Sequence, residues 1–157
     1  MKHSIAALAL AVAAASGLAW GTEGHHGKHG DDDTAFGRPA DPAAKARVVA
    51  VGMSDAMRFD PAEVRVKRGE AVKFVVANHG KVDHEFVLGT MDEIKEHAEM
   101  MRKMPNMEHD DASQLRIRPG GQQALAWQFD KPGEFYYACL VPGHFEAGMV
   151  GKVIVSR

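Results

Sequence analysis

A short segment near the C-terminus contains a cysteine, a histidine and a methionine at regular spacing. Four residues separate Cys139 from His144, and four more separate His144 from Met149. A soft thiolate, a neutral imidazole and a weak thioether suit a copper ion that cycles between Cu(I) and Cu(II), whereas zinc sites seldom include methionine. The spacing therefore predicts one loop that supplies three ligands to copper, and one further histidine is needed.

Two histidines upstream are candidates for that fourth ligand. His84 directly precedes an apolar run that is typical of a strand, while His79 lies in the middle of a polar loop beside Gly80, where a solvated histidine is ordinary. We favour His84 and keep His79 as the alternative. Two histidines and Cys139 then form a trigonal plane, with Met149 as the long axial ligand.

With these residues identified, the sequence resembles the cupredoxins, which are small blue or green copper proteins. Within them it is similar to the bacterial periplasmic cupredoxins of the CopI type, which are associated with copper tolerance. The resemblance extends from about residue 47 to residue 155 and rests on Met57-Arg-Phe-Asp-Pro61, on residues 78–88 and on residues 139–149. It implies one type 1 copper site held by His84, Cys139, His144 and Met149.

Two features depart from the family pattern. Plastocyanin-like loops have the spacing Cys-x2-His-x4-Met and azurin-like loops Cys-x4-His-x3-Met, whereas this chain has Cys-x4-His-x4-Met. Glu85 stands where many cupredoxins have asparagine, so the usual side-chain tether between the two ligand loops is not expected.

The elements that position these residues are short apolar segments separated by turns that contain glycine and proline. Such a pattern predicts an all-β, antiparallel sandwich. The expected strands are residues 47–51, 63–66, 71–77, 84–88, 115–118, 123–129, 134–138 and 150–155. The cupredoxin-like Greek-key order of the strands is implied by the resemblance alone.

One segment is predicted to be an inserted helix, at about residues 91–104. Thr90 and Glu93 have the spacing of a capping box, and strong helix formers follow until Pro105. The segment is rich in methionine and histidine, which either pack a core or form a second, Cu(I)-selective site, since thioethers bind Cu(I) without deprotonation. The candidates for this secondary site are His97, Met100, Met101, Met104, Met107 and His109.

The N-terminus reads as a signal peptide, residues 1–19. Lys2 and His3 precede the small apolar run 5–15, and residues 17–19 offer small side chains for cleavage. The run is short and no second apolar stretch of membrane-spanning length follows, so we expect a periplasmic protein without a membrane anchor.

Residues 20–45 are expected to be a disordered leader, ahead of a cupredoxin domain over residues 46–157. The leader is rich in Gly, His, Asp and Pro. Its histidines, His25, His26 and His29, either bind divalent metal weakly or simply help solubility, and both interpretations stay open.

Cysteine count and charge limit the function classes. An exported chain with one cysteine cannot form an internal disulfide, so Cys139 is buried, bonded to another chain or bound to metal, and its neighbours favour metal. Removal of residues 1–19 would remove one basic residue, Lys2, and leave 18 Lys and Arg against 21 Asp and Glu. This slightly acidic balance does not favour nucleic-acid binding.

These observations predict an exported mononuclear copper protein with one-electron redox chemistry. The resemblance implies periplasmic copper tolerance, with copper ions as the ligand and a redox or copper-transfer protein as partner. The alternative is a soluble electron shuttle to a respiratory or nitrogen-oxide reductase. An enzyme is not expected, because the chain lacks the His-Cys-His element of multicopper oxidases; weak oxidation of Cu(I) at the site is the least favoured interpretation.

Overall fold

The computed structural model describes residues 34–41, 45–105 and 111–157. The expected signal peptide, most of the leader with its three histidines, and Met107 and His109 lie outside the described residues.

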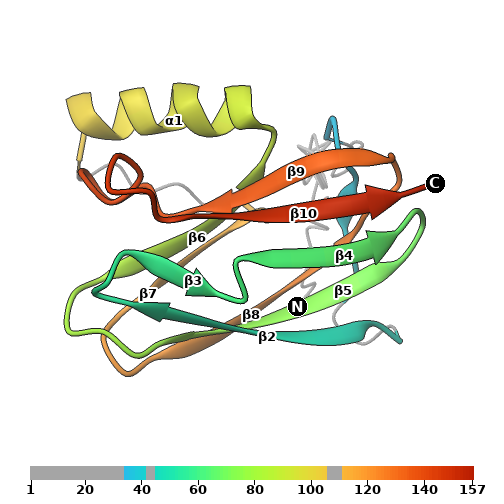
Figure 1. Cartoon of the computed structure of the whole chain (residues 1–157), viewed down its shortest axis with the longest axis horizontal. Helices are drawn as coiled ribbons and strands as arrows, with labels where there is room; N and C mark the ends of the chain where they lie inside the picture. The colour runs from blue at the N-terminus through green and yellow to red at the C-terminus, as the bar shows by residue number, and fades with distance from the viewer. Residues whose placement is uncertain (1–33, 42–44, 106–110) are drawn as a thin grey trace, which may run out of the picture. The chain divides into compact units, whose positions relative to one another are not determined.

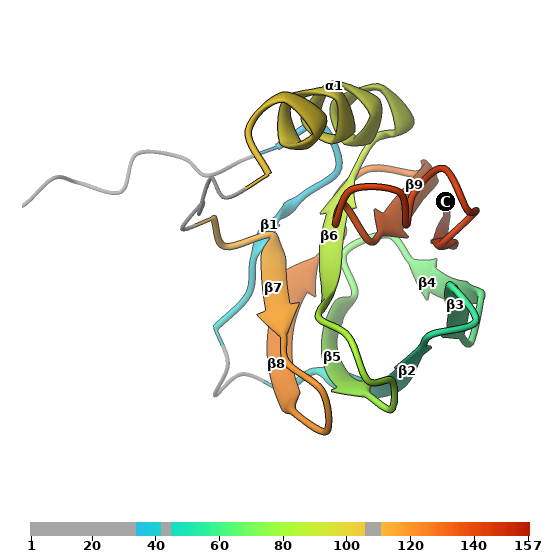
Figure 2. The ribbon, with the colours of Figure 1, turned by 90° about the vertical axis from the view of Figure 1, so that its left-hand side faces the viewer.

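Two five-stranded sheets face each other, as Figure 2 shows from the end of the sandwich. The first sheet has, in spatial order, β1 (Arg38–Pro39), β8 (Gln122–Gln128), β5 (Ala71–Asn78), β2 (Arg47–Ser54) and β3 (Arg58–Asp60). The second has β4 (Glu63–Lys67), β10 (Val150–Ser156), β9 (Gly133–Ala138), β6 (His84–Gly89) and β7 (Gln114–Ile117). The predicted all-β sandwich with one helix is confirmed.

The pairing is mixed, which differs from the antiparallel sandwich expected. β2 runs parallel to β5, and β4 runs parallel to β10. The chain leaves the first sheet after β3, forms β4 in the second sheet and returns as β5, so β2 and β5 do not form a hairpin and can share a direction. β1 and β3 were not predicted, because two or three residues are too few to show an alternating pattern.

The core between the sheets follows from alternation along the strands. In β5, Val72, Phe74 and Val76 are fully buried and the residues between them are partly exposed. The ring of Phe86 lies 5.2 Å from that of Phe74 and 5.1 Å from that of Tyr137. Each such side chain contributes about 1.5 to 3 kcal/mol when it is buried. This core fixes the strands from which the candidate ligands project.

Residues 34–41 belong to the sandwich, although the sequence placed them in the leader. Phe36 is only 2% exposed, and its ring stacks on Trp127 at 5.0 Å. β1 then pairs with β8, which carries Trp127. A single apolar residue in a polar stretch shows no periodicity, so the sequence carried no signal for this contact.

The helix α1 (Met91–Lys103) begins as predicted. The Thr90 side chain accepts a hydrogen bond from the Glu93 backbone N–H, and the Glu93 carboxylate accepts one from the Thr90 backbone N–H. These reciprocal bonds satisfy donors that a helix N-terminus otherwise leaves unpaired.

α1 covers the outer face of the second sheet above β6 and β9 (Figure 2). Its buried residues are Ile94, Ala98 and Met101, which join Val87 and Ala138 of the sheet in a second, smaller core. The spacing of the three residues forms one apolar stripe on the helix. Met101 is therefore a packing residue of this smaller core.

Three connections meet at one end of the sandwich, on the left in Figure 1. They are the β2–β3 turn (55–57), the β5–β6 loop (79–83) and the β9–β10 loop (139–149). His84 directly follows the second, and the third contains Cys139, His144 and Met149, so the topology brings together segments that are far apart in the sequence.

Candidate metal centre

His84, Cys139 and His144 form a cluster at this end. The Sγ of Cys139 lies 3.7 Å from Nδ1 of His84 and 3.2 Å from Nδ1 of His144. One ligand atom from each residue lies within 4.8 Å of the others. In the described part of the chain this is the one such group of His, Cys, Asp and Glu side chains. His84 and Cys139 are fully buried, and His144 is partly exposed.

Sheet geometry places two of the three. His84 is the first residue of β6 and lies opposite Ile117 of β7, with its ring inside the sandwich. Along β9, Phe135 and Tyr137 face the core, and Cys139 continues this alternation one step beyond the strand. Two strands of one sheet therefore present the imidazole and the thiol to the same space.

Local turns place His144 and Met149. The His144 N–H donates to the Val141 carbonyl at 3.0 Å, and the Met149 N–H donates to the His144 carbonyl at 3.0 Å. Gly143 and Gly148 have φ values of +89° and +86°, which glycine adopts at little cost. The turns that the sequence predicted at Pro142-Gly143 and at Gly148 are confirmed.

Met149 is held directly beside the other residues of the loop. Its carbonyl accepts the Cys139 N–H at 3.1 Å, and its side chain is fully buried in the main core. A buried thioether at this position fits a weak axial ligand, and its ligand role remains a prediction.

The Cys139 thiol lies in an environment that discourages ionisation when no metal is bound. Burial raises its pKa to about 11, although the backbone N–H groups of Glu85 and Val141 act in the opposite direction. The Glu85 N–H donates to Sγ at 3.3 Å. Since a thiolate rather than a thiol binds metal, an incoming ion has to displace this proton.

His144 is prepared to act as a neutral ligand. Burial lowers its pKa, and the nearby His84 ring lowers it further. The two rings lie 4.9 Å apart. A neutral imidazole keeps a lone pair for metal, so no proton competes at this position near neutral pH.

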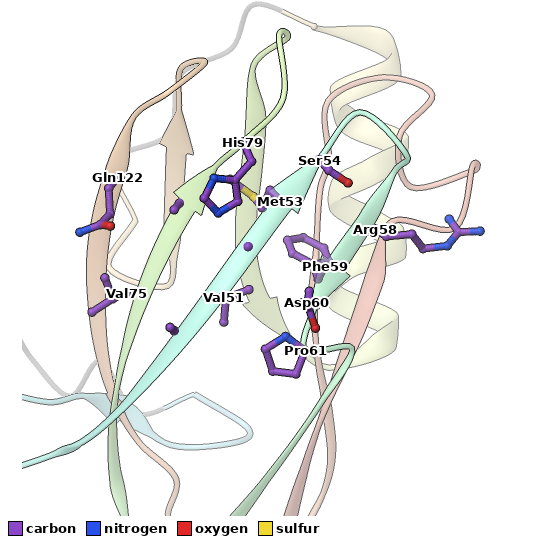
Figure 3. Close-up of a pocket in the computed structure, with 13 residues that line it drawn as sticks. Val51, Met53, Ser54, Arg58, Phe59, Asp60, Pro61, Val75, His79 and Gln122 are labelled. Carbon is purple, nitrogen blue, oxygen red and sulfur yellow. The ribbon is translucent and has the colours of Figure 1, made fainter.

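His79, the alternative ligand, lies outside the cluster. Its backbone N–H donates to the Met53 carbonyl at 2.9 Å, and its ring lies over Gly52 on the outer face of the first sheet. There it lines a shallow groove with Ala77 and Gln122 (Figure 3). The structure thus brings His84 to the cysteine and leaves His79 at the surface.

Asn78 supports the His84 loop and was not identified from the sequence. Its Nδ2 donates to the carbonyls of Val82 at 2.8 Å and Ile117 at 2.9 Å, and its Oδ1 accepts from the Gly80 N–H at 2.8 Å. This side chain ties the loop to β7. An asparagine two residues before a glycine indicates a turn, but the bond to Ile117 depends on the tertiary fold.

The donor set fits copper. Two imidazole Nδ1 atoms face one thiol sulfur, and a buried methionine belongs to the same loop. Trigonal sites with two histidines, a cysteine and a weak axial methionine are typical of copper proteins that transfer electrons.

The candidates for a second Cu(I) site are only partly brought together. Met101 is buried, Met104 is 44% exposed, and His97 and Met100 are partly buried. Met107 and His109 lie outside the described residues. A second site therefore remains a prediction. Within the described residues, α1 is too short and too polar to span a bilayer.

The chain is similar to known copper proteins. A family model described as copper binding proteins of the plastocyanin/azurin family matches residues 46–156. A protein from Rubrivivax gelatinosus named copper-resistant cuproprotein CopI is 56% identical over 132 residues, which cover 83% of this chain and 80% of the relative. A protein of the same name from Vibrio cholerae is 44% identical over 119 residues, covering 74% and 70% respectively.

Solved structures show the same fold. The reduced auracyanin of the photosynthetic bacterium Roseiflexus castenholzii matches with a TM-score of 0.64 at 18% identity, covering 73% of this chain and 100% of that chain. The family model and the curated relatives confirm the cupredoxin resemblance of the sequence.

Proposed function

Because the chain belongs to the plastocyanin/azurin family of copper-binding proteins, we propose that it is an exported copper-tolerance protein with one redox-active type 1 copper. Its relatives from Rubrivivax gelatinosus and Vibrio cholerae are both named copper-resistant cuproproteins. The expected signal peptide supports a periplasmic location. The proposed role is binding and electron exchange rather than catalysis.

The observation that carries the proposal is the cluster of His84, Cys139 and His144, of which the first two are fully buried. In the proposed centre the two Nδ1 atoms and the Sγ would bind the copper, and the Met149 thioether would supply a weak fourth donor. When bound, copper supplies one-electron exchange between Cu(I) and Cu(II). The hydrogen-bonded loop and β6 hold these side chains in one arrangement, which suits both oxidation states.

The surface around His144 is suited to contact with a partner protein. His144 and Phe145 are partly exposed, and Pro142 and Ala147 are exposed beside them. Val82, in the neighbouring loop, is 44% exposed. An apolar rim of this kind excludes water around the imidazole edge and gives electrons a short path to a docked redox or copper-transfer partner.

The copper centre is tested by adding Cu(II) to the purified metal-free protein and recording the visible spectrum. We expect intense thiolate-to-copper charge-transfer absorption that saturates at one equivalent. The matched control is Cys139→Ser, which should bind copper without that absorption while its far-ultraviolet circular dichroism is unchanged. A wild-type protein that remains colourless, or a serine variant with full colour, would contradict the proposal.

The physiological role is tested in cells. Deletion of the gene should reduce growth in medium with added copper, and expression of the wild-type protein should restore growth. The electron-shuttle alternative predicts a different result, namely normal copper tolerance together with a defect in respiratory electron transfer.

A further inference from the structure

The turn between β2 and β3 lies against the His84 loop and is well defined. The Met57 N–H donates to the Ser54 carbonyl at 3.0 Å, and Met57 has a φ of +56°. A non-glycine residue in the left-handed region is uncommon and persists when its surroundings hold it. Here Met57 is partly buried against the main core. The turn therefore fixes the directions of Asp55 and of Arg58, which is the first residue of β3.

Asp55 reaches the outer nitrogen of the candidate ligand His84. Its Oδ1 lies 3.2 Å from Nε2 of His84, and its two carboxylate oxygens accept the Lys81 N–H at 3.0 and 2.8 Å. A Cβ at Gly80 would collide with this carboxylate, so the glycine leaves room for it. When Nε2 carries the proton and donates to Asp55, the Nδ1 lone pair faces Cys139.

Arg58 reaches the other ligand loop. Its Nη1 donates to the carbonyls of Met57 at 2.7 Å and Ala147 at 3.0 Å. Gly148 lies beside the guanidinium, where an added Cβ would be 3.4 Å from Nη1. Figure 3 shows the Arg58 side chain extending from β3 away from the other labelled residues of the groove. Asp55 in the turn and Arg58 directly after it thus bond, respectively, to the β5–β6 loop that leads into His84 and to the β9–β10 loop.

We propose that the β2–β3 turn positions both ligand loops, with Asp55 orienting His84 and Arg58 holding the segment between His144 and Met149. This inference rests on the proposed copper centre and adds two positioning residues to it. Residues that hydrogen-bond to a ligating histidine fix its tautomer and orientation, and their loss typically costs 10- to 100-fold in metal affinity. A carboxylate beside the imidazole also adds negative charge that favours Cu(II) over Cu(I).

A purely structural role for Asp55 is the competing explanation, since aspartate is common in turns and this one accepts the Lys81 N–H. Asp55→Asn separates the two, because asparagine keeps an acceptor oxygen and removes the charge. Asp83→Asn is the matched control. Asp83 is the neighbour of His84 in sequence, but its carboxylate pairs with Arg116 at 3.4 Å.

The experiment measures Cu(I) and Cu(II) affinities of the full chain by competition with chelators. We expect Asp55→Asn to lose about tenfold in Cu(II) affinity with a smaller loss for Cu(I), and Asp83→Asn to match the wild type. A tenfold loss confined to Cu(II) corresponds to a rise of about 59 mV in reduction potential. Equal shifts in both variants, or none in either, would overturn the role of Asp55.

A metal-free measurement keeps the test independent of how well the variants fold. Nitrogen-15 NMR of the wild-type protein should show His84 as the tautomer protonated on Nε2. A proton on Nδ1 would overturn the proposal, because the Asp55 carboxylate would then face an unprotonated nitrogen. The visible spectrum of the copper-loaded wild-type protein tests the copper centre itself. If the wild type is coloured and the variants have the same copper affinities, only the positioning role is rejected.

Arg58 is tested in the same way. Arg58→Met keeps much of the side-chain length and removes the donors, and Arg65→Met is the control, since Arg65 pairs with Glu63 on β4 at 2.7 Å. We expect Arg58→Met to lower copper affinity about tenfold and to change the ratio of the charge-transfer bands, because the loop of His144 and Met149 is released. If Arg58→Met has the same charge-transfer bands and the same copper affinity as Arg65→Met, the positioning role of Arg58 is overturned.

Discussion

The backbone N–H of Glu85 in β6 donates to the Sγ of Cys139 at 3.3 Å and thereby links the strand of His84 to the β9–β10 loop. The bond uses the main chain, so the glutamate side chain in place of the family's asparagine does not remove it. The bond also fixes the position of His84, because His84 directly precedes Glu85 in β6. The position of the first histidine thus follows from strand pairing and one backbone hydrogen bond.

The two candidate histidines can be separated by substitution. His84→Ala removes a fully buried imidazole 3.7 Å from the cysteine sulfur, so we expect loss of the charge-transfer absorption. His79→Ala changes an exposed side chain, so the spectrum should persist and stability should change by no more than about 0.5 kcal/mol. Visible absorption and urea unfolding of both variants check this, and the reverse pattern would transfer the ligand role to His79.

Met149→Leu should keep copper and alter its potential. The axial bond in such sites is long and weak, so the two histidines and the thiolate carry most of the binding. Leucine has a similar volume, and the swap in the buried position should cost less than about 1.5 kcal/mol. We expect the reduction potential to rise, measured by redox titration, because a donor that favours Cu(II) is lost. A variant that no longer binds copper would show that Met149 is a strong ligand.

The difference between local and distant signals explains which features the sequence could predict. Cys139, His144 and Met149 lie in one loop, so their spacing alone indicated a site, and the Thr90 capping box is likewise local. Asp55 contacts His84 only because the β2–β3 turn and the β5–β6 loop meet at one end of the sandwich. No periodicity in the sequence around Asp55 encodes that contact.

The packing of Phe36 on Trp127 is the clearest contact between residues far apart in the sequence, and it can be tested by substitution. Phe36→Ala should destabilise the protein by about 3 to 5 kcal/mol, since the ring is buried and packs against Trp127 and Phe135. Urea unfolding measures the change. Phe36→Leu is the control, and its free energy of unfolding should fall clearly less than that of Phe36→Ala. If Phe36→Ala lowers the free energy of unfolding by less than about 0.5 kcal/mol, residues 34–41 have no packing role and belong to the leader.

Glu70, in the turn between β4 and β5, should make the stability of the protein depend on pH. This turn lies at the end of the sandwich away from the candidate ligands (Figure 1). Burial opposes the ionisation of Glu70, but the Lys67 N–H at 2.8 Å and the Arg47 guanidinium at 2.5 Å outweigh burial and lower its pKa below 4.5. A lowered pKa contributes stability above the unfolded pKa, and this contribution is lost as pH falls through the folded value.

Glu70→Gln should therefore cost about 0.5 to 1 kcal/mol at pH 7 and progressively less as the pH falls below 4.5. Urea unfolding at a series of pH values measures the difference from wild type. The control is Glu96→Gln on the exposed side of α1. A Glu70→Gln effect that stays constant with pH would assign the loss to packing rather than to charge.

The methionines of the helical segment allow a test of copper handling beyond the main site. Met101 packs against Ile94 and Leu140 in the smaller core, whereas Met104 is 44% exposed and Met100 partly so. If the segment binds Cu(I), the wild-type protein should bind more than one equivalent, measured by chelator competition under anaerobic conditions. Exposed thioethers are suitable donors because they need no deprotonation.

The triple variant Met100→Leu, Met104→Leu and Met107→Leu should lose the additional Cu(I), keep the visible spectrum and protect cells less against copper. Leucine preserves helix propensity and volume, so stability should change by less than about 1.5 kcal/mol. Met101→Leu alone is the matched control and should keep the additional Cu(I), because its side chain serves the core. A single equivalent of Cu(I) in the wild type, with unchanged tolerance in the triple variant, would reduce these methionines to packing and surface residues and favour the electron-shuttle alternative.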